Sequence, residues 1–372
     1  MGKAMPEAEA RILTPPRETV DFIGHDEAEH ALLDAVAGGR LPHAWLISGP
    51  EGIGKATLAF RFARYLLANP PSDSAAAGGL FAADDIPAEG LGSLHMDAEN
   101  PIFRRVAAAG HGDILTVERQ VNDSGKLSQQ IRIDDVRKAI DFAHMTSSEG
   151  GYKVIIVDGA ELMNRASENA FLKILEEPPA DTIILMVSHN PGRLLPTTRS
   201  RCRKLSLKPL ATDVVISMLQ HHMPETSATD ATELARLSDG SIGRTLRLAS
   251  GGGLAIYRDT VNILGELPHP DVKKVQALAA KLAKSGADDT YRCGIDLFRW
   301  WLSRIVLASS RGAEADRGLS ADEKDIATRA AATAILPIWL KRMDDADSLI
   351  RSADALNLDR KQVVQSLFLS LA

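Results

Sequence analysis

A glycine-rich loop, residues 49–55 (GPEGIGK), is the sequence feature that most restricts the possible fold. It follows an apolar run, Ala44–Ser48, and precedes a stretch with helical spacing of apolar residues. Glycines let a backbone bend so tightly that consecutive N–H groups point at one anion, and a helix N-terminus adds positive charge. A strand, this loop and a helix are the context of a phosphate-binding P-loop. The alternative is a strand-to-helix turn that binds nothing.

Further apolar runs predict a parallel sheet around this loop. Strands are expected near Asp113–Val117, over Tyr152–Val157 and over Thr182–Val187, with helical patterns between them. Bare apolar strands are typical of sheets covered by helices on both faces, so we expect a three-layer α/β domain. Residues 69–110 are rich in Ala, Gly, Asp and Pro and are interpreted as an insertion.

The residues expected to hold a nucleotide include some that disfavour catalysis. Gly49, Gly52, Gly54 and Lys55 would bind phosphates. A P-loop ATPase has Ser or Thr after the lysine to hold Mg²⁺, and here that position is Ala56. Thr57 follows it, turned by about 100° around the helix. We therefore expect Mg²⁺ to be held poorly, and Thr57 to be at most a distorted substitute.

A second acidic motif shows a similar loss. Asp158 ends the apolar strand and is expected to face the metal, or else only to cap a helix. A carboxylate that polarises the attacking water usually comes next, and here that position is Gly159, with Glu161 too far along the chain. The sequence thus predicts little or no hydrolysis, while it leaves open whether ATP binds weakly.

Overall composition excludes several other classes of protein. The 372 residues carry a net charge of −6, so the chain cannot coat nucleic acid by charge alone. Cys202 and Cys293 are too few for a disulfide scaffold or a four-thiolate zinc site, which favours a reducing, cytoplasmic environment. The sequence contains no run of about 18 apolar residues, so no membrane span is predicted. Residues 1–17 are expected to be a mobile leader.

The rear half of the chain is predicted to be all helical. After Pro209 strand patterns vanish, and apolar residues recur at helical spacing, as in Ile295, Phe298, Leu302 and Ile305. Trp300 and Trp301 lie in that amphipathic stretch and are expected in the core or in an interface, rather than on a surface where bases stack.

Three segments around the P-loop carry a specific resemblance. They are Gly39–Ala44 (GRLPHA), Glu168–Pro179 (ENAFLKILEEPP) and Leu195–Cys202 (LPTTRSRC). In this order they resemble the AAA+ subunits of the bacterial DNA polymerase III clamp loader, and among these the delta-prime subunits. The resemblance implies an AAA+ α/β domain over residues 18–208, a helical lid over 209–267 and a helical collar over 268–372.

The resemblance also implies a function. It suggests a cytoplasmic subunit without enzymatic activity of its own, part of a DNA-directed DNA polymerase holoenzyme that loads a sliding clamp on primed DNA. The implied partners are the gamma/tau ATPase subunits, the delta subunit, the clamp and primer–template DNA. Two alternatives remain: an active gamma/tau-like ATPase subunit, or another P-loop AAA+ ATPase.

Individual residues take roles from the same resemblance. Arg201, within Ser-Arg-Cys, would be an arginine finger that acts in trans on a neighbour's ATP. Ser188 and Arg244 would be the two nucleotide sensors, although the active pattern places arginine at position 243, which is Gly243 here. Arg165 is expected to contact DNA phosphates. The family's zinc module needs four cysteines in the insertion, and residues 69–110 contain none, so no zinc is expected.

Overall fold

The computed structural model describes residues 14–39, 41–71, 92–121, 128–284, 286, 288–312 and 318–372. They form two compact units. The first contains the chain up to Val214 together with Ser241–Gly243, and the second contains Val215–Gly240 and Arg244–Ala372. Most of the expected leader and the middle of the expected insertion, residues 72–91, lie outside the described residues. Within the last part of the leader, the 3-10 helix η1 covers Pro16–Glu18.

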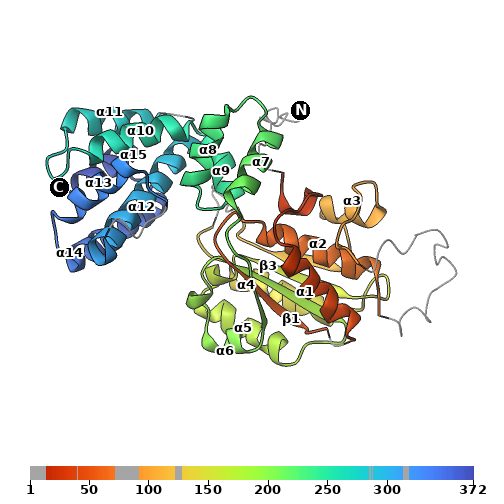
Figure 1. The fold of residues 1–372 in the computed structure, drawn as a ribbon. Coiled ribbons are helices and arrows are strands. Elements are labelled where there is room, and N and C mark those ends of the chain that lie inside the picture. The colour runs from red at the N-terminus through yellow and green to blue at the C-terminus, as the bar shows by residue number, and fades with distance from the viewer. Residues whose placement is uncertain are drawn as a thin grey trace, which may run out of the picture. The chain divides into compact units, whose positions relative to one another are not determined.

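The first unit contains a five-stranded parallel sheet, which confirms the predicted α/β fold (Figure 1). Its strands are β1 (Ala44–Ser48), β2 (Ile114–Val117), β3 (Lys153–Asp158), β4 (Thr182–Ser188) and β5 (Arg203–Ser206). Their order is β2-β3-β4-β1-β5, and every neighbouring pair is parallel. The carboxyl ends of all five strands therefore meet at one edge, where the P-loop also begins.

Helices cover both faces of this sheet because alternate strand residues point to opposite sides. Trp45 and Ile47 of β1 pack into one core with α1 (Asp26–Ala37), α2 (Lys55–Ala68) and α3 (Pro101–Ala107). Ala44 and Leu46 pack into the other core with α4 (Ile133–His144) and α5 (Arg165–Glu176). The central strands β1, β3 and β4 are buried almost throughout, as bare apolar runs predict.

The described residues of the second unit are helical, as predicted. Its helices are α7 (Thr212–His222), α8 (Ala228–Leu237), α9 (Ile242–Ser250), α10 (Gly253–Leu264), α11 (Val272–Leu282), α12 (Asp288–Arg311), α13 (Ala321–Ala331), α14 (Leu336–Leu356) and α15 (Arg360–Leu369). The first residues of α7 and α9 belong to the first unit. Trp300 and Trp301 are 3% and 1% exposed, so both are core residues, as expected.

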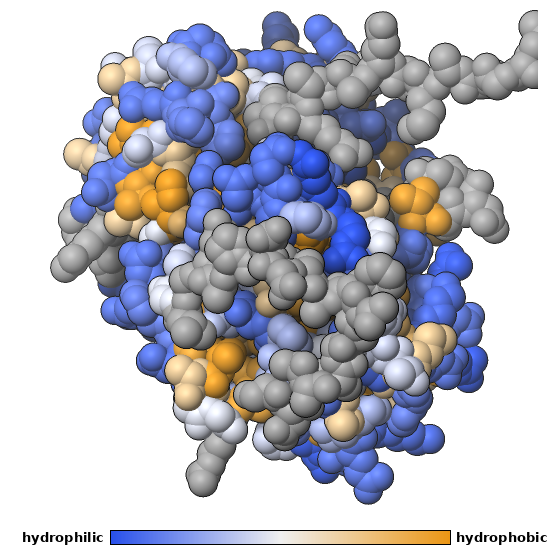
Figure 2. Space-filling view, turned by 90° about the vertical axis from the view of Figure 1, so that its right-hand side faces the viewer, coloured by the Kyte–Doolittle hydropathy of each residue, from blue (hydrophilic) through white to orange (hydrophobic). Residues whose placement is uncertain are grey.

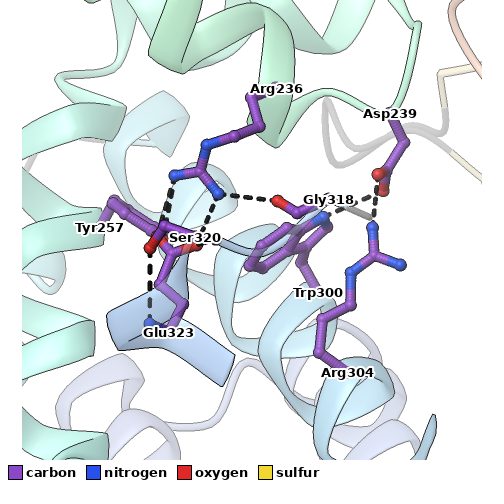
Figure 3. A network of polar contacts seen from close by, with 8 residues as sticks. All are labelled: Arg236, Asp239, Tyr257, Trp300, Arg304, Gly318, Ser320 and Glu323. Atoms are coloured by element: carbon purple, nitrogen blue, oxygen red, sulfur yellow. Dashed lines mark hydrogen bonds and ion pairs between the residues drawn. The ribbon is translucent and has the colours of Figure 1, made fainter. Parts of the chain in front are cut away.

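A partly buried ion pair joins α8 to α13 in this unit (Figure 3). The Arg236 guanidinium donates to both carboxylate oxygens of Glu323, at 2.6 and 2.9 Å, and to the Gly318 carbonyl oxygen at 2.8 Å. The Tyr257 hydroxyl and the Ser320 backbone N–H also donate to Glu323. Because the buried charge has several partners, it links the residues of the expected lid and collar inside one unit.

Asp239 makes a second link in the same network (Figure 3). Its carboxylate accepts from the Trp300 indole N–H at 3.0 Å and from the Arg304 guanidinium. Asp239 adopts a left-handed backbone conformation, with φ of 51°, two residues after the end of α8. The end of α8 is thereby tied to α12.

The surface of one side of the molecule is mainly polar (Figure 2). Apolar side chains on this face lie in separate small patches among polar ones, which is usual for a folded protein. Among the described residues, no helix combines the length and apolar character needed to cross a bilayer.

Candidate nucleotide site and arginine turn

The P-loop runs from the end of β1 to the start of α2, as predicted. Gly49, Gly52 and Gly54 have φ values of 144°, 74° and 100°, a region that favours glycine. A Cβ atom at Gly49 would lie 2.5 Å from the Leu207 carbonyl oxygen, so that position has no room for a side chain. The loop therefore has the glycine conformations typical of a P-loop, and Gly49 lets it pack closely against the chain at Leu207.

Lys55, the first residue of α2, lies inside this loop. It is 3% exposed, and its ammonium donates to the Pro50 carbonyl oxygen. Burial lowers the pKa of Lys55 to about 8, although nearby Glu161, Glu51 and Asp158 partly oppose that shift. Lys55 is thus a buried cation surrounded by acidic groups.

The sheet brings the expected strand-end residues together. Ser188 lies opposite Ser48 in the β1–β4 register, and Asp158 lies opposite Val187 in the β3–β4 register. Burial raises the pKa of Asp158, with His189 and Lys55 acting in the opposite direction. The P-loop, Asp158 and Ser188 therefore share one edge of the sheet, as a nucleotide site needs.

Glu161 lies closer to this edge than its spacing suggests. Gly159 turns the chain with φ of 76°, and the 3-10 helix η3 (Ala160–Leu162) follows immediately. The Glu161 carboxylate is 9% exposed and accepts a 2.9 Å hydrogen bond from the His189 backbone N–H. Burial raises its pKa, but hydrogen bonds from backbone N–H groups and the nearby Ser188 hydroxyl outweigh that effect and hold the pKa below its usual value. The turn at Gly159 is what linear spacing could not reveal.

Residues 241–243 also contact the P-loop. The Ser241 hydroxyl donates to the Glu51 carbonyl oxygen at 2.7 Å, and the Gly243 N–H donates to the Gly52 carbonyl oxygen at 2.9 Å. A Cβ atom at Gly243 would lie 3.0 Å from the Gly52 Cα atom. The backbone of residues 241–243 therefore lies so close to the P-loop that a side chain at position 243 would have little room beside Gly52.

Arg244, the second expected sensor, contacts residues of the second unit. Its guanidinium lies 3.7 Å from the Asp239 carboxylate and donates to the Asp296 carbonyl oxygen at 3.4 Å. Burial lowers the pKa of Arg244, while Asp239 and Asp296 oppose that shift. Asp239 thus contacts both Arg244 and Arg304.

Arg201, the middle residue of the Ser-Arg-Cys motif, directly follows the short helix α6 (Pro196–Ser200). Its guanidinium lies 2.7 Å from the Glu176 carboxylate, donates to the Thr197 carbonyl oxygen at 3.0 Å and is 34% exposed. The next residue, Cys202, is buried against Met186, and burial raises the pKa of its thiol to about 12. The cysteine anchors the turn, and the arginine is left accessible.

Glu168 braces the same turn, a role that the sequence did not indicate. It is 4% exposed and accepts 2.7 Å hydrogen bonds from the Leu195 backbone N–H and from the Thr198 hydroxyl. The sequence does offer a clue, because Glu168 lies three positions before the apolar Phe171 and therefore on the same, buried face of α5. A buried carboxylate needs donors, and here they come from the arginine turn.

Arg165 is the first residue of α5 and is exposed. Asn164 caps this helix by accepting a 2.8 Å hydrogen bond from the Ser167 N–H. In the part of the chain that the structure describes, no group of three or more His, Cys, Asp or Glu residues could hold a metal ion.

Comparisons with known proteins match the sequence to subunits of DNA polymerase III. The family model described as "DNA polymerase III, delta subunit" matches residues 88–211. The chain is 35% identical over 217 residues to the DNA polymerase III subunit delta' of Pseudomonas aeruginosa, a match that covers 58% of each protein. It is 32% identical over 221 residues to the corresponding Escherichia coli subunit, covering 59% of this chain and 58% of that one.

A third relative belongs to the other subunit type. The DNA polymerase III subunit tau of Salmonella typhimurium is 27% identical over 261 residues, which cover 68% of this chain and 36% of the relative. The matches thus span less than two thirds of the length of these relatives. The chain, which carries a P-loop on a five-stranded parallel sheet, is thus similar in sequence to the delta' and tau subunits of DNA polymerase III.

Proposed function

We propose that this chain is the delta-prime-type subunit of a clamp loader, that it does not hydrolyse ATP and that it supplies Arg201 to ATP bound by a neighbouring gamma/tau subunit. The loader would place a sliding clamp on primed DNA together with a delta subunit. The helices of the second unit would join the chain to these partners.

The observation that carries this proposal is an accessible, braced Arg201 in a chain whose own nucleotide site lacks catalytic groups. Position 56 is Ala and position 159 is Gly, so neither the metal hydroxyl nor the adjacent carboxylate is present. Loss of both should leave little turnover, because phosphoryl transfer depends on positioning and charge neutralisation. A braced arginine in a chain with such a site is most useful to another subunit.

Arginine suits this role for a chemical reason. Its guanidinium stays charged and offers a planar set of donors that fits phosphate oxygens. In trans, such a group stabilises the negative charge that develops on the transferred phosphoryl group. With 34% of its side chain exposed and an exposed carboxylate as its partner, Arg201 can exchange that carboxylate for phosphate.

The chain's own site would bind ATP weakly, if nucleotide enters it. Gly49, Gly52 and Gly54 would present backbone N–H groups to the phosphates, and Lys55 would add a positive charge. Ser188 would lie near the terminal phosphate. Any ATP that enters would have poorly held Mg²⁺, because Thr57 is one residue beyond the usual position and turned by about 100° on α2.

Contact with DNA would be through phosphates. Arg165, exposed at the N-terminus of α5, combines a charged side chain with a helix end that favours anions. A Glu at this position should weaken binding of primed DNA by the assembled loader, similarly for all sequences. Unchanged DNA binding by that variant would contradict this assignment.

The decisive experiment is an assembled loader that carries Arg201→Ala, assayed for ATPase and clamp loading. One ATP site would lose a contribution on the order of 10³–10⁵ in rate, so total ATPase should fall partially and clamp loading further. Arg201→Lys should restore little, because ammonium lacks the planar fork. The control is Lys204→Ala, an exposed residue on β5. Normal ATPase and loading by Arg201→Ala would refute the trans-acting role.

One observation favours a second candidate, an active ATPase subunit. The Glu161 carboxylate is buried at the sheet edge and interacts with Lys55, so it could substitute for the carboxylate absent at position 159. In that case the isolated chain should hydrolyse ATP in the presence of primed DNA, and both Glu161→Gln and Lys55→Ala should abolish the activity. No turnover by the isolated chain would exclude this candidate.

A further inference from the structure

Two carboxylates on helix α5 contact the turn that carries Arg201, and they differ in burial. Glu168 lies in the first turn of the helix and is 4% exposed, whereas Glu176 is its last residue and has a side chain that is 49% exposed. Glu168 contacts a backbone N–H and the Thr198 hydroxyl of the turn. Glu176 contacts the Arg201 guanidinium itself. These contacts assign different tasks to the two residues.

Glu168 fixes the position of the turn. Its two donors, the Leu195 N–H and the Thr198 hydroxyl, lie at the start and in the middle of the segment that leads into Arg201. Hydrogen bonds to an ionised carboxylate are shorter and stronger than neutral ones, and both distances here are 2.7 Å. Because the carboxylate is buried, loss of these donors would leave an uncompensated charge. The turn is therefore held firmly against α5.

Glu176 holds the guanidinium less firmly. The ion pair is 2.7 Å long, but both side chains are partly exposed, at 34% and 49%. Exposed ion pairs are weak, since water and salt screen them and both side chains lose freedom. A phosphate offers Arg201 the same planar recognition with more negative charge. Exchange of Glu176 for a phosphate therefore needs only a small input of free energy.

We propose that Glu168 is a positioning residue for Arg201, and that Glu176 is a resting partner that a phosphate of the neighbouring subunit's nucleotide displaces. This inference rests on the proposed trans-acting role of Arg201. Glu168 keeps the turn in register, and Glu176 prevents the guanidinium from finding other anions before assembly.

The part that concerns Glu168 can be tested on the free chain. Hydrogen exchange of the Leu195 amide should be faster in Glu168→Ala, because its acceptor is lost. Glu168→Gln keeps an acceptor oxygen and should restore much of the protection. The matched control is Glu177→Gln, which changes an exposed carboxylate next to Glu176 and should leave this exchange unchanged. Equal exchange in Glu168→Ala and wild type would show that Glu168 does not fix the turn.

The functional part needs the assembled loader. Glu168→Ala should lower ATPase toward the level of Arg201→Ala, and Glu168→Gln should recover part of it. Glu176→Gln should raise the rate at low ATP by roughly twofold to fivefold, the range that an exposed ion pair can contribute. That rise should disappear in the double variant with Arg201→Ala. Glu177→Gln should behave as wild type.

Failure of this inference differs from failure of the proposed function. If Arg201→Ala lowers ATPase but Glu168→Ala and Glu176→Gln do not change it, Arg201 acts in trans without the control inferred here. If Arg201→Ala has no effect, the trans-acting role itself is wrong, and displacement of Glu176 by phosphate falls with it. Hydrogen exchange in the free chain would still decide whether Glu168 fixes the turn.

Discussion

The backbone N–H of Gly243 donates a 2.9 Å hydrogen bond to the carbonyl oxygen of Gly52, so a segment distant in sequence rests directly on the P-loop. The resemblance to active clamp-loader subunits would place arginine at this position. Here a Cβ atom would lie 3.0 Å from the Gly52 Cα atom, which is backbone and cannot move aside easily.

Gly243→Arg should therefore destabilise the first unit rather than create a sensor. Forcing a side chain into a packed place costs about 1–3 kcal/mol, so thermal unfolding should shift to lower temperature. Gly92→Arg is the control, because a Cβ atom at Gly92 meets no other atom within 4 Å. A Gly243→Arg chain with wild-type stability and new ATPase activity would contradict this account.

The buried cation Lys55 predicts a pH dependence of stability. Its pKa in the folded chain, about 8, is below the usual 10.5, so the folded state releases this proton at lower pH than the unfolded state. The free energy of unfolding should therefore rise as pH increases between these values, by about 1.5 kcal/mol from pH 8 to pH 9.5. Urea denaturation of the wild type and of Lys55→Met, compared at each pH, isolates this contribution. If Lys55 has an ordinary pKa, the difference in unfolding free energy between the wild type and Lys55→Met should not change over this pH range.

Removing one partner of the Arg236–Glu323 ion pair should lower stability more than replacing both partners by apolar residues. Glu323→Ala would leave the partly buried Arg236 guanidinium without its carboxylate, and losing hydrogen bonds to a charged group typically costs about 1.5–3 kcal/mol. Hydrogen exchange in α8 and α13 should increase strongly in this variant. The double variant Arg236→Met/Glu323→Met should recover much of the protection, because it removes both charges. If the single and double variants lost the same amount of hydrogen-exchange protection, the two charges would not stabilise each other.

The two cysteines should be unreactive in the native chain. Burial raises the pKa of the Cys202 thiol to about 12 and that of Cys293 to about 11, and the thiolate is the reactive form. Iodoacetamide near pH 8 should modify neither residue until denaturant is added, when both should react. Rapid modification of Cys202 in the folded protein would mean that the turn beside Arg201 opens readily.

Much of the fold follows from local sequence patterns. The apolar runs at Ala44–Ser48 and Thr182–Val187 predicted two central strands almost to the residue, because a strand buried on both faces must be apolar throughout. Strand β5 (Arg203–Ser206) was not predicted. It is a short edge strand with two exposed charged residues, so it has neither an apolar run nor an alternating pattern to reveal it.

The candidate site was predictable only where one segment supplies the chemistry. The P-loop glycines and Lys55 are contiguous, so spacing alone identified them. Glu161 reaches the site through a left-handed turn at Gly159, and Glu168 meets its donors 27 and 30 residues later in the chain. Such relationships depend on how α5 packs beside α6, which no local pattern encodes.

The division of the chain also has a consequence for synthesis. The first unit includes Ser241–Gly243, which come after the first residues of the second unit. Its P-loop cannot obtain the hydrogen bonds to Glu51 and Gly52 until these residues have left the ribosome. At roughly 5–20 residues added per second, the nascent α/β domain waits a few seconds with those carbonyl groups unpaired by this segment. A polypeptide cut after Val214 would keep that immature loop permanently.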